Sequence, residues 1–381
     1  MDLRLTDDQQ LFRETTRKFL ESTSPLVTVR QLADAEPAGF DRKWWKRGAE
    51  LGWVSMLVPE EEGGGSVSGH GLLDLVLVAE EMGRLVSPGP LVPTNVVADA
   101  IARSGSPAQR QQLLPDLVNG DAVAAWCLGA PVAGVGTGGG RVEASPQGDS
   151  FVLDGATGPV EAAGQADHYL VTTGTGDGVT QFMVAADAPG VTVVAAHGLD
   201  LVRRFAQVRF DQVTVPKEVV LGVPGEGGAD AERQLQIAAV LQCAEMVGAL
   251  DRAFEFTVAY AFDRYSFGRP LASYQALKHR FADMKTWLEA SHATAGAAAR
   301  AVDSGSPSAP ELVSVAQSYV GERGPVILQD CVQLHGGIGV TWDHDLHLYL
   351  RRVVTDSTQW GTPADHRERV AVAMGMSESH P

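Results

Sequence analysis

The pattern of apolar positions changes twice along the chain and divides it into three regions. Across residues 1–121 apolar side chains recur at helical spacing, and Thr6 with Gln9 forms a capping-box pattern that predicts a helix start. Across residues 122–225 short apolar runs alternate with glycine-rich turns, which is typical of antiparallel strands. Helical spacing returns across residues 226–381. We therefore expect an α+β multidomain chain with an N-terminal helical domain, a middle antiparallel β domain and a C-terminal helical bundle.

Composition and charge narrow the class of protein. The chain has 381 residues, 44% of them hydrophobic, so it can bury a large core. Its formal net charge is −17, which disfavours nucleic acid and anionic lipid as partners, because both require a basic surface. The sequence contains no run of about 18 apolar residues, so we expect no membrane association.

The cysteines and the N-terminal residues indicate the cellular compartment in which the protein works. Cys127, Cys243 and Cys331 are far apart, odd in number and lack a CxxC pair. This spacing predicts reduced, buried thiols rather than a disulfide framework or a zinc site. The first residues, MDLRLTDDQQLF, lack the apolar core of a secretory signal. We therefore expect a cytoplasmic protein.

One glycine pattern and one cluster of acids and histidines have the residue types of ligand sites. Gly134, Gly136 and Gly139 have the spacing of a dinucleotide fingerprint, which requires a strand before it and a helix after it. Polar, turn-rich residues follow instead, so we expect a loop and reject a Rossmann fold. Residues 343–347 contain aspartates and histidines, but a helix would point them in different directions, so we expect no metal site.

Two segments in the last third of the chain are more informative. In DRYSFGRPLASYQALKH, which begins at Asp263, an arginine precedes a glycine between two helices. An arginine fork suits a pyrophosphate, and a glycine lets the backbone approach it. The second segment, QLHGGIG, begins at Gln333 and follows a helix. Taken singly, each segment is more typical of an ordinary helix end or interhelical turn.

Together, in this order and spacing, the two segments resemble the acyl-CoA dehydrogenase family. That family shows an arginine, Phe-Gly, a proline and a glutamine on the next helix, and later a Gln-x-x-Gly-Gly-x-Gly turn. The matching residues are Arg264, Phe267, Gly268, Pro270 and Gln275, followed by Gln333, Gly336, Gly337 and Gly339. The stretches ELGWVSMLVPEEEGGGS and FDQVTVPKEVVLG are similar to further family segments. The resemblance thus covers nearly the whole chain.

The resemblance implies a fold and a reaction. The fold has an N-terminal helical domain, a middle β-barrel domain and a C-terminal four-helix bundle. The reaction is α,β-dehydrogenation of an acyl-CoA thioester by FAD held between two subunits, with an electron-transfer flavoprotein as electron acceptor. The residues implied to hold the pyrophosphate and adenosine end of a neighbour's FAD are Arg264, Phe267, Gln275, Gln333, Gly336 and Gly337.

The positions that would meet the flavin ring and the substrate depart from the family. Residues 129–136 lack both hydroxyls of the corresponding family segment, and Pro159 replaces a tryptophan. Glu161 replaces a threonine, and a carboxylate near the flavin would oppose the negative charge that develops on reduction. Trp360 stands at the usual position of the catalytic glutamate, and Ala238 at its alternative position. We therefore expect no catalytic residue in this chain.

These departures favour a non-catalytic subunit of a hetero-oligomeric enzyme, like the α2β2 acyl-CoA dehydrogenases that degrade steroid side chains in actinobacteria. A catalytic partner would supply the base and the pocket for the flavin ring. One alternative is a complete homo-oligomeric dehydrogenase with Glu245 as an unusual base, since it lies on the same helical face as Ala238. For Glu245 itself we expect a helix-surface role or an inter-subunit ion pair. Another alternative is a scaffold protein of the same fold.

Overall fold

The first third of the computed structural model is helical, as the apolar spacing predicts. The structure describes residues 5–34, 39–136 and 138–376. The helices of this region are α1 (Asp7–Thr23), α2 (Leu26–Asp34), α3 (Arg42–Glu50), α4 (Gly71–Arg84), α5 (Leu91–Ser104) and α6 (Pro107–Val118), with the short 3-10 helix η1 (Glu60–Glu62). Thr6 and Gln9 form the predicted capping box at the start of α1.

An eight-stranded sheet forms the middle of the chain. Its strands are β1 (Ala124–Leu128), β2 (Arg141–Gln147), β3 (Ser150–Glu161), β4 (His168–Thr175), β5 (Gly178–Ala185), β6 (Val191–Ala196), β7 (Phe205–Pro216) and β8 (Val220–Leu221), with 3-10 helices η2 (Ala163–Gln165) and η3 (Lys217–Val219). The order is β6-β7-β3-β2-β4-β5-β8, and β1 pairs with β4. The antiparallel prediction is correct for most pairs but wrong for β1, which runs parallel to β4, and for the single pair between β2 and β4, which is also parallel. Every residue of β1 is buried, which is typical of a parallel strand.

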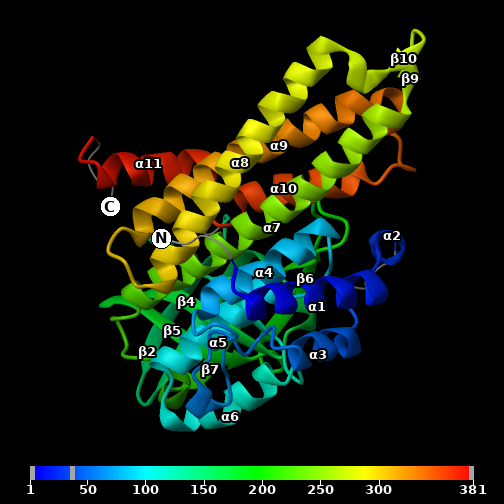
Figure 1. Cartoon of the computed structure of the whole chain (residues 1–381). Helices are drawn as coiled ribbons and strands as arrows, with labels where there is room; N and C mark the ends of the chain where they lie inside the picture. The colour runs from blue at the N-terminus through cyan, green and yellow to red at the C-terminus, as the bar shows by residue number, and fades with distance from the viewer. Residues whose placement is uncertain (1–4, 35–38, 137, 377–381) are drawn as a thin grey trace.

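Long helices return after the sheet. They are α7 (Gly228–Asp263), α8 (Gln275–Asp303), α9 (Ala309–His335), α10 (Leu346–Gln359) and α11 (Pro363–Ala373), with the short elements β9 (Tyr265–Ser266), β10 (Arg269–Pro270), η4 (Leu271–Ser273) and η5 (Gly336–Val340). α7 packs against α8, α9 and α10, and α11 packs on α9. Figure 1 shows that α7, α8 and α9 extend beyond the sheet and that β9 and β10 lie at their outer end.

A close crossing of α4 and α7 joins the N-terminal helices to the C-terminal ones. At Gly248 an added Cβ would lie 1.9 Å from the Glu80 carbonyl oxygen, and at Gly83 one would lie 2.0 Å from the Glu245 carbonyl oxygen. Two glycines therefore allow the two backbones to touch at a distance that any side chain would prevent. The crossing therefore fixes the part of α7 that contains Glu245 against α4.

The buried apolar side chains form a larger cluster among the helices and a smaller cluster within the sheet. Cys127, Cys243 and Cys331 are free and buried, as their spacing predicts. In the described ranges, no helix combines the length and the apolar character needed to cross a membrane.

Candidate functional site

The six residues implied to contact FAD lie at the outer end of the long helices (Figure 1). We call this region the tip and define it as residues 262–275 and 333–342. The six are Arg264, directly after α7; Phe267, between β9 and β10; Gln275, the first residue of α8; Gln333, near the end of α9; and Gly336 and Gly337 in η5. Residues from opposite ends of the C-terminal region are thus brought to one end of the molecule.

A stacked pair of rings joins the two segments of the tip. The rings of Tyr260 and His335 have centroids 4.3 Å apart and planes 21° apart. The Tyr260 hydroxyl also donates to the His335 carbonyl at 3.3 Å. Tyr260 accepts the backbone hydrogen bond of Arg264 at 2.8 Å, and His335 directly precedes Gly336. The arginine segment and the glycine turn are therefore fixed relative to each other.

The tip exposes large apolar side chains. Phe267 is 98% exposed and its backbone has φ 48°, in the left-handed region that non-glycine residues rarely adopt. The other exposed large side chains of the tip are Phe262, Tyr265, Ile338, Val340 and Trp342. Exposed apolar groups gathered in one place are typical of an interface with another molecule.

The polar groups of the tip suit a diphosphate-bearing ligand. Arg264, Gln275 and Gln333 are exposed to solvent. At Gly336 and Gly337 an added Cβ would meet nothing within 4 Å, so the space in front of this turn is open. A guanidinium fork, amide groups and an unobstructed backbone turn are the donors that proteins use for pyrophosphate.

A separate cleft lies between the sheet and the end of α10. Its volume is about 320 Å³. Leu128, Pro159, Val160 and Phe205 line it from the sheet side, with polar groups contributed by the residues His197, Thr355, Thr358 and Gln359. The described part of its lining includes no aspartate or glutamate. Among its described lining residues, none therefore offers a carboxylate that could serve as a base.

Two indole rings form one wall of the cleft. The rings of Trp126 and Trp360 are stacked, with centroids 5.1 Å apart and planes 22° apart. Trp360 is only 6% exposed, and the Trp126 Nε1 donates to the Thr172 hydroxyl at 2.9 Å. The side chain at the position expected for the catalytic glutamate is thus packed as part of the wall.

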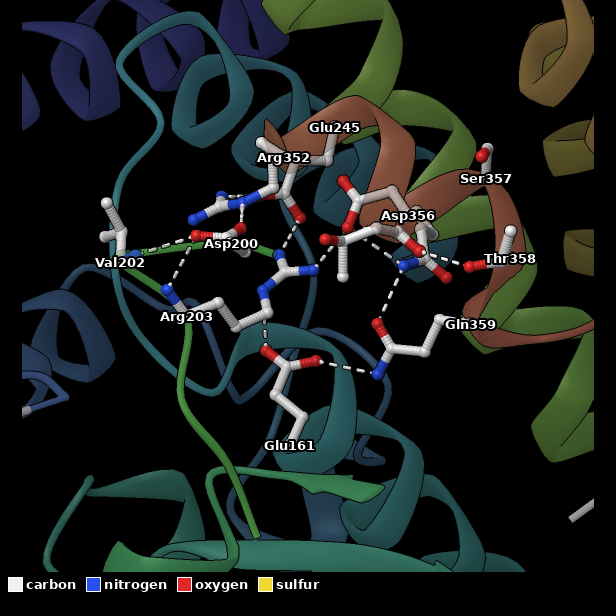
Figure 2. A network of polar contacts seen from close by, with 12 residues as sticks. Glu161, Asp200, Val202, Arg203, Glu245, Arg352, Asp356, Ser357, Thr358 and Gln359 are labelled. Atoms are coloured by element: carbon white, nitrogen blue, oxygen red, sulfur yellow. Dashed lines mark hydrogen bonds and ion pairs between the residues drawn. The ribbon is translucent and has the colours of Figure 1, made fainter. Parts of the chain in front are cut away.

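A buried ionic network adjoins the cleft (Figure 2). We define the buried network as the following residues, none more than 6% exposed: Glu161, Asp200, Arg203, Glu245, Arg352 and Asp356. Arg203 Nε lies 3.0 Å from Glu161 Oε1, and its Nη1 lies 2.7 Å from Asp356 Oδ1. Arg203 Nη2 and Arg352 Nη1 each bind one oxygen of Glu245. Arg352 Nε binds Asp200.

The network connects the sheet to the C-terminal helices. Glu161 ends β3, whereas Asp200 and Arg203 lie between β6 and β7. Glu245 comes from α7, and Arg352 comes from α10 with Asp356. Gln359, which lines the cleft, donates to Glu161 at 3.4 Å and accepts from Gln242 at 2.9 Å. Charged groups from distant segments therefore fix the end of α10 that lines the cleft.

The network holds more carboxyl groups than guanidinium groups, four against two. Burial raises the pKa of Asp356 to about 8, and it also raises the pKa of Glu161 although Arg203 opposes this shift. Burial acts in the same direction on Asp200, but Arg352 and Arg203 outweigh it and lower the pKa of that carboxyl. The shift favours the protonated form of Asp356, which reduces the excess negative charge.

Comparisons with known proteins match this architecture. Residues 6–121 match the family model for the acyl-CoA dehydrogenase N-terminal domain, and residues 225–375 match the model for the C-terminal domain. The acyl-CoA dehydrogenase IpdE2 of Mycolicibacterium smegmatis is 31% identical over 369 residues, which cover 96% of this chain and 98% of that protein. The chain belongs to the acyl-CoA dehydrogenase family.

Solved acyl-CoA dehydrogenases share the whole fold. Butyryl-CoA dehydrogenase from Megasphaera elsdenii is 26% identical with a TM-score of 0.88, over 98% of this chain and 100% of that one. A structure described as a Tcur3481-Tcur3483 steroid ACAD variant is 29% identical with a TM-score of 0.85, over 97% and 98% of the two chains. FAD is the cofactor of this family.

One expectation about the acyl-CoA dehydrogenase positions is wrong. Glu245 does not lie on a helix surface: it is 2% exposed, and both of its carboxylate oxygens bind arginines within the chain. Glu161 does not line the cleft, because its carboxylate turns into the network and pairs with Arg203. Its charge is therefore balanced by a guanidinium.

One sequence signal could have indicated the network. Glu245 stands in the apolar stretch IAAVLQCAEMVGAL, residues 237–250, whose positions are all buried. A helix that is apolar on every side is a core helix, and a carboxylate within it requires a cationic partner. The identity of that partner is not visible locally, because Arg203 and Arg352 lie 42 and 107 residues away.

Proposed function

We propose that this chain is the non-catalytic subunit of a hetero-oligomeric, FAD-dependent acyl-CoA dehydrogenase of α2β2 type. Its tip would complete the FAD site of a catalytic partner subunit. The observation that carries the proposal is a contrast within the chain. The described lining of the cleft lacks a carboxylate and includes a packed Trp360, whereas the tip exposes Arg264, Gln275 and Gln333 toward solvent.

The reaction would be α,β-dehydrogenation of an acyl-CoA thioester. It requires a carboxylate that removes a proton next to the thioester carbonyl. Bound FAD supplies the acceptor for the hydride from the neighbouring carbon. The partner subunit would hold both the base and the flavin ring.

The residues of this chain would contribute binding and orientation. Arg264 would place its guanidinium on the pyrophosphate, where a charged, forked donor binds strongly. Gln275 and Gln333 would donate to polar atoms of the same end of the cofactor, and Gly336 with Gly337 would let the backbone approach. Phe267 would cover the ligand with its exposed ring and exclude water.

Relatives support the substrate class and the electron acceptor. The Tcur3481-Tcur3483 structure is described as a steroid ACAD under a double name, which favours a bulky acyl-CoA such as a steroid side-chain thioester and two kinds of subunit. A structure that is 27% identical, with a TM-score of 0.89, is described with the electron transferring flavoprotein of Acidaminococcus fermentans and covers 98% of this chain and 99% of that one. We take an electron-transfer flavoprotein as the acceptor.

The geometry of Glu245 argues against a complete homo-oligomeric enzyme that uses it as a base. A base must reach the proton that it removes, within about 3 Å or through one water. Glu245 is absent from the described lining of the cleft, and Arg203 and Arg352 occupy its two oxygens.

The first test compares the chain purified alone with the chain co-expressed with a second family member, encoded by a neighbouring gene, that has the catalytic glutamate. We expect the lone chain to purify without stoichiometric FAD and without turnover, and the complex to show both. Stoichiometric FAD together with acyl-CoA turnover by the lone chain would contradict the proposal. A partner that is fully loaded and fully active without this chain would favour the scaffold alternative.

The second test is the Arg264→Ala variant in the complex. Loss of a charged bidentate contact costs roughly 1.5–3 kcal/mol, so FAD should bind about ten- to a hundredfold more weakly. FAD affinity is measured by titrating FAD into the apo-complex and following flavin fluorescence. Arg367→Ala is the matched control, since Arg367 is 56% exposed on α11 and pairs only at the surface with Glu322. Unchanged affinity in Arg264→Ala would remove the tip from the FAD site.

A further inference from the structure

Arg30, in α2 of the N-terminal region, binds a loop next to the tip. Its Nη1 donates to the Trp342 carbonyl at 2.6 Å, and its Nη2 donates to the Asp343 carbonyl at 3.2 Å. Its Nε donates to Asp345 Oδ1 at 3.1 Å, and Nη2 reaches the same oxygen at 2.5 Å. One guanidinium thus binds three of four consecutive residues of a loop that lies more than 300 residues later in the sequence.

The loop that Arg30 binds continues directly from the glycine turn. The Thr341 backbone N–H and hydroxyl both donate to the Ile338 carbonyl, at 3.1 and 2.7 Å. The His344 N–H donates to the Thr341 carbonyl at 3.4 Å. Because each hydrogen bond closes a short turn, the loop is connected to η5, the 3-10 helix that contains Gly336 and Gly337.

The opposite side of this unit is held by an aromatic cluster. The rings of His335 and His344 have centroids 4.5 Å apart, and the Phe256 ring lies 5.9 Å from His335 and 6.0 Å from His344. His335 stacks on Tyr260, one helical turn before Arg264. The glycine turn is therefore fixed toward α7 by ring packing and toward the N-terminal region by Arg30.

α2 has its own attachment to the sheet. Arg204, directly before β7, donates through Nη2 to the Leu32 carbonyl at 3.2 Å and through Nη1 to the Leu201 carbonyl at 2.6 Å. The helix that carries Arg30 is thus tied to the sheet. Arg30 connects this support to the loop that follows the glycine turn.

We propose that Arg30 is a positioning residue for the FAD site: it acts through loop 342–345 to hold the Gly336–Gly337 turn in the orientation that binds a neighbour's FAD. The inference rests on the proposed function of the tip. It holds whether the neighbour is a different subunit or a second copy of this chain. Arg30 does not touch the cofactor, so its effect is on affinity through geometry.

The test is Arg30→Ala in the assembled, FAD-free complex, with FAD affinity followed by flavin fluorescence during titration. We expect affinity to fall about three- to tenfold, less than for a direct contact, since the loop keeps its aromatic support. Arg42→Ala is the matched control. Arg42 is likewise an N-terminal-region arginine that binds a carboxylate, Asp167, and a backbone carbonyl, that of Gln165, but these lie at the sheet.

Thermal unfolding and complex mass separate positioning from general stability. We expect Arg30→Ala and Arg42→Ala to show similar melting temperatures and intact complexes, with weakened FAD binding in Arg30→Ala alone. Equal FAD affinity in both variants, or loss of the complex in Arg30→Ala, would overturn the inference. If Arg30→Ala does not fold, Arg30→Gln, which keeps one donor for the Trp342 carbonyl, replaces it and is judged by the same criteria.

The result for Arg264→Ala tells the two proposals apart. If Arg264→Ala weakens FAD binding and Arg30→Ala does not, the positioning role fails and the proposed function stands. If neither variant changes FAD affinity, the assignment of the tip to FAD fails, and the role of Arg30 fails with it.

Discussion

The tip and the buried network both gather polar groups from distant segments, but the surroundings of those groups are opposite. At the tip, Arg264, Gln275 and Gln333 are exposed beside large apolar side chains. In the network, Arg203 and Arg352 are buried and bind carboxylates. The difference indicates which groups remain available to another molecule. The network holds this chain together, whereas the polar groups of the tip are open to solvent.

The largest effect is expected when the network loses a cation. Arg203→Met leaves the buried carboxyls of Glu161 and Asp356 without their guanidinium, so the free energy of unfolding should fall by about 3–5 kcal/mol. Urea unfolding of the purified chain measures this change. Arg209→Met, at an exposed position of β7, is the control and should change little. A loss below about 1 kcal/mol in Arg203→Met would mean that the network does not stabilise the fold.

Asp356→Asn is expected to raise the free energy of unfolding, by less than Arg203→Met lowers it. The amide oxygen can still accept from Arg203 and Gln242, whereas the buried charge is removed. Folding raises the pKa of Asp356 from 3.8 to about 8, so between these values the folded chain retains a proton that the unfolded chain has released. This group therefore reduces stability as pH rises through that window.

Asp356→Asn should lack this pH-dependent loss and should be more stable than the parent by about 1–3 kcal/mol at pH 9. Unfolding in urea at pH 6 and at pH 9 measures the difference. Asp149→Asn, at a fully exposed position, is the control and should leave the pH dependence unchanged. Parallel pH profiles for Asp356→Asn and the parent would show that Asp356 does not carry the proton.

The smallest effect is expected for the local stability of the tip, which should fall as pH falls, opposite to the effect of Asp356. Burial lowers the pKa of His335, and it lowers the pKa of His344 together with the neighbouring His335. Their neutral forms are favoured on folding, so the stability that they provide is present above about pH 6.5 and is lost as pH falls. Hydrogen exchange of residues 336–345, corrected for intrinsic rates, should be up to about tenfold faster at pH 5.5 than at pH 7.5. Equal corrected rates would contradict this difference between the tip and the network.

The tip could be predicted from the sequence because its residues stand in two short contiguous segments. The motif residues of each segment lie close together in the sequence, at a connection between helices. The segments are Arg264 to Gln275 and Gln333 to Gly337. The structure brings the two segments together, and their contact with FAD stays a prediction. The order of helices, sheet and helices was visible in the apolar spacing for the same local reason.

The network could not be predicted in the same way, because its members are spread from residue 161 to residue 356 and meet only after folding. Arg351 and Arg352 are adjacent and identical in type, yet only Arg352 is fully buried. Local periodicity does not decide which of two neighbouring charges faces the core. The parallel pairing of β1 escaped prediction similarly, since strand direction depends on chain connections and not on residue alternation.

The exposed apolar tip has a consequence for the abundance of this protein in a cell. A chain that displays Phe267, Val340 and Trp342 before it meets a neighbour offers the kind of surface that chaperones and proteases recognise. If the chain assembles with a partner as proposed, copies made in excess of that partner should aggregate or be degraded, and the amount of folded chain should follow the amount of partner. Assembly would then set the abundance of this chain.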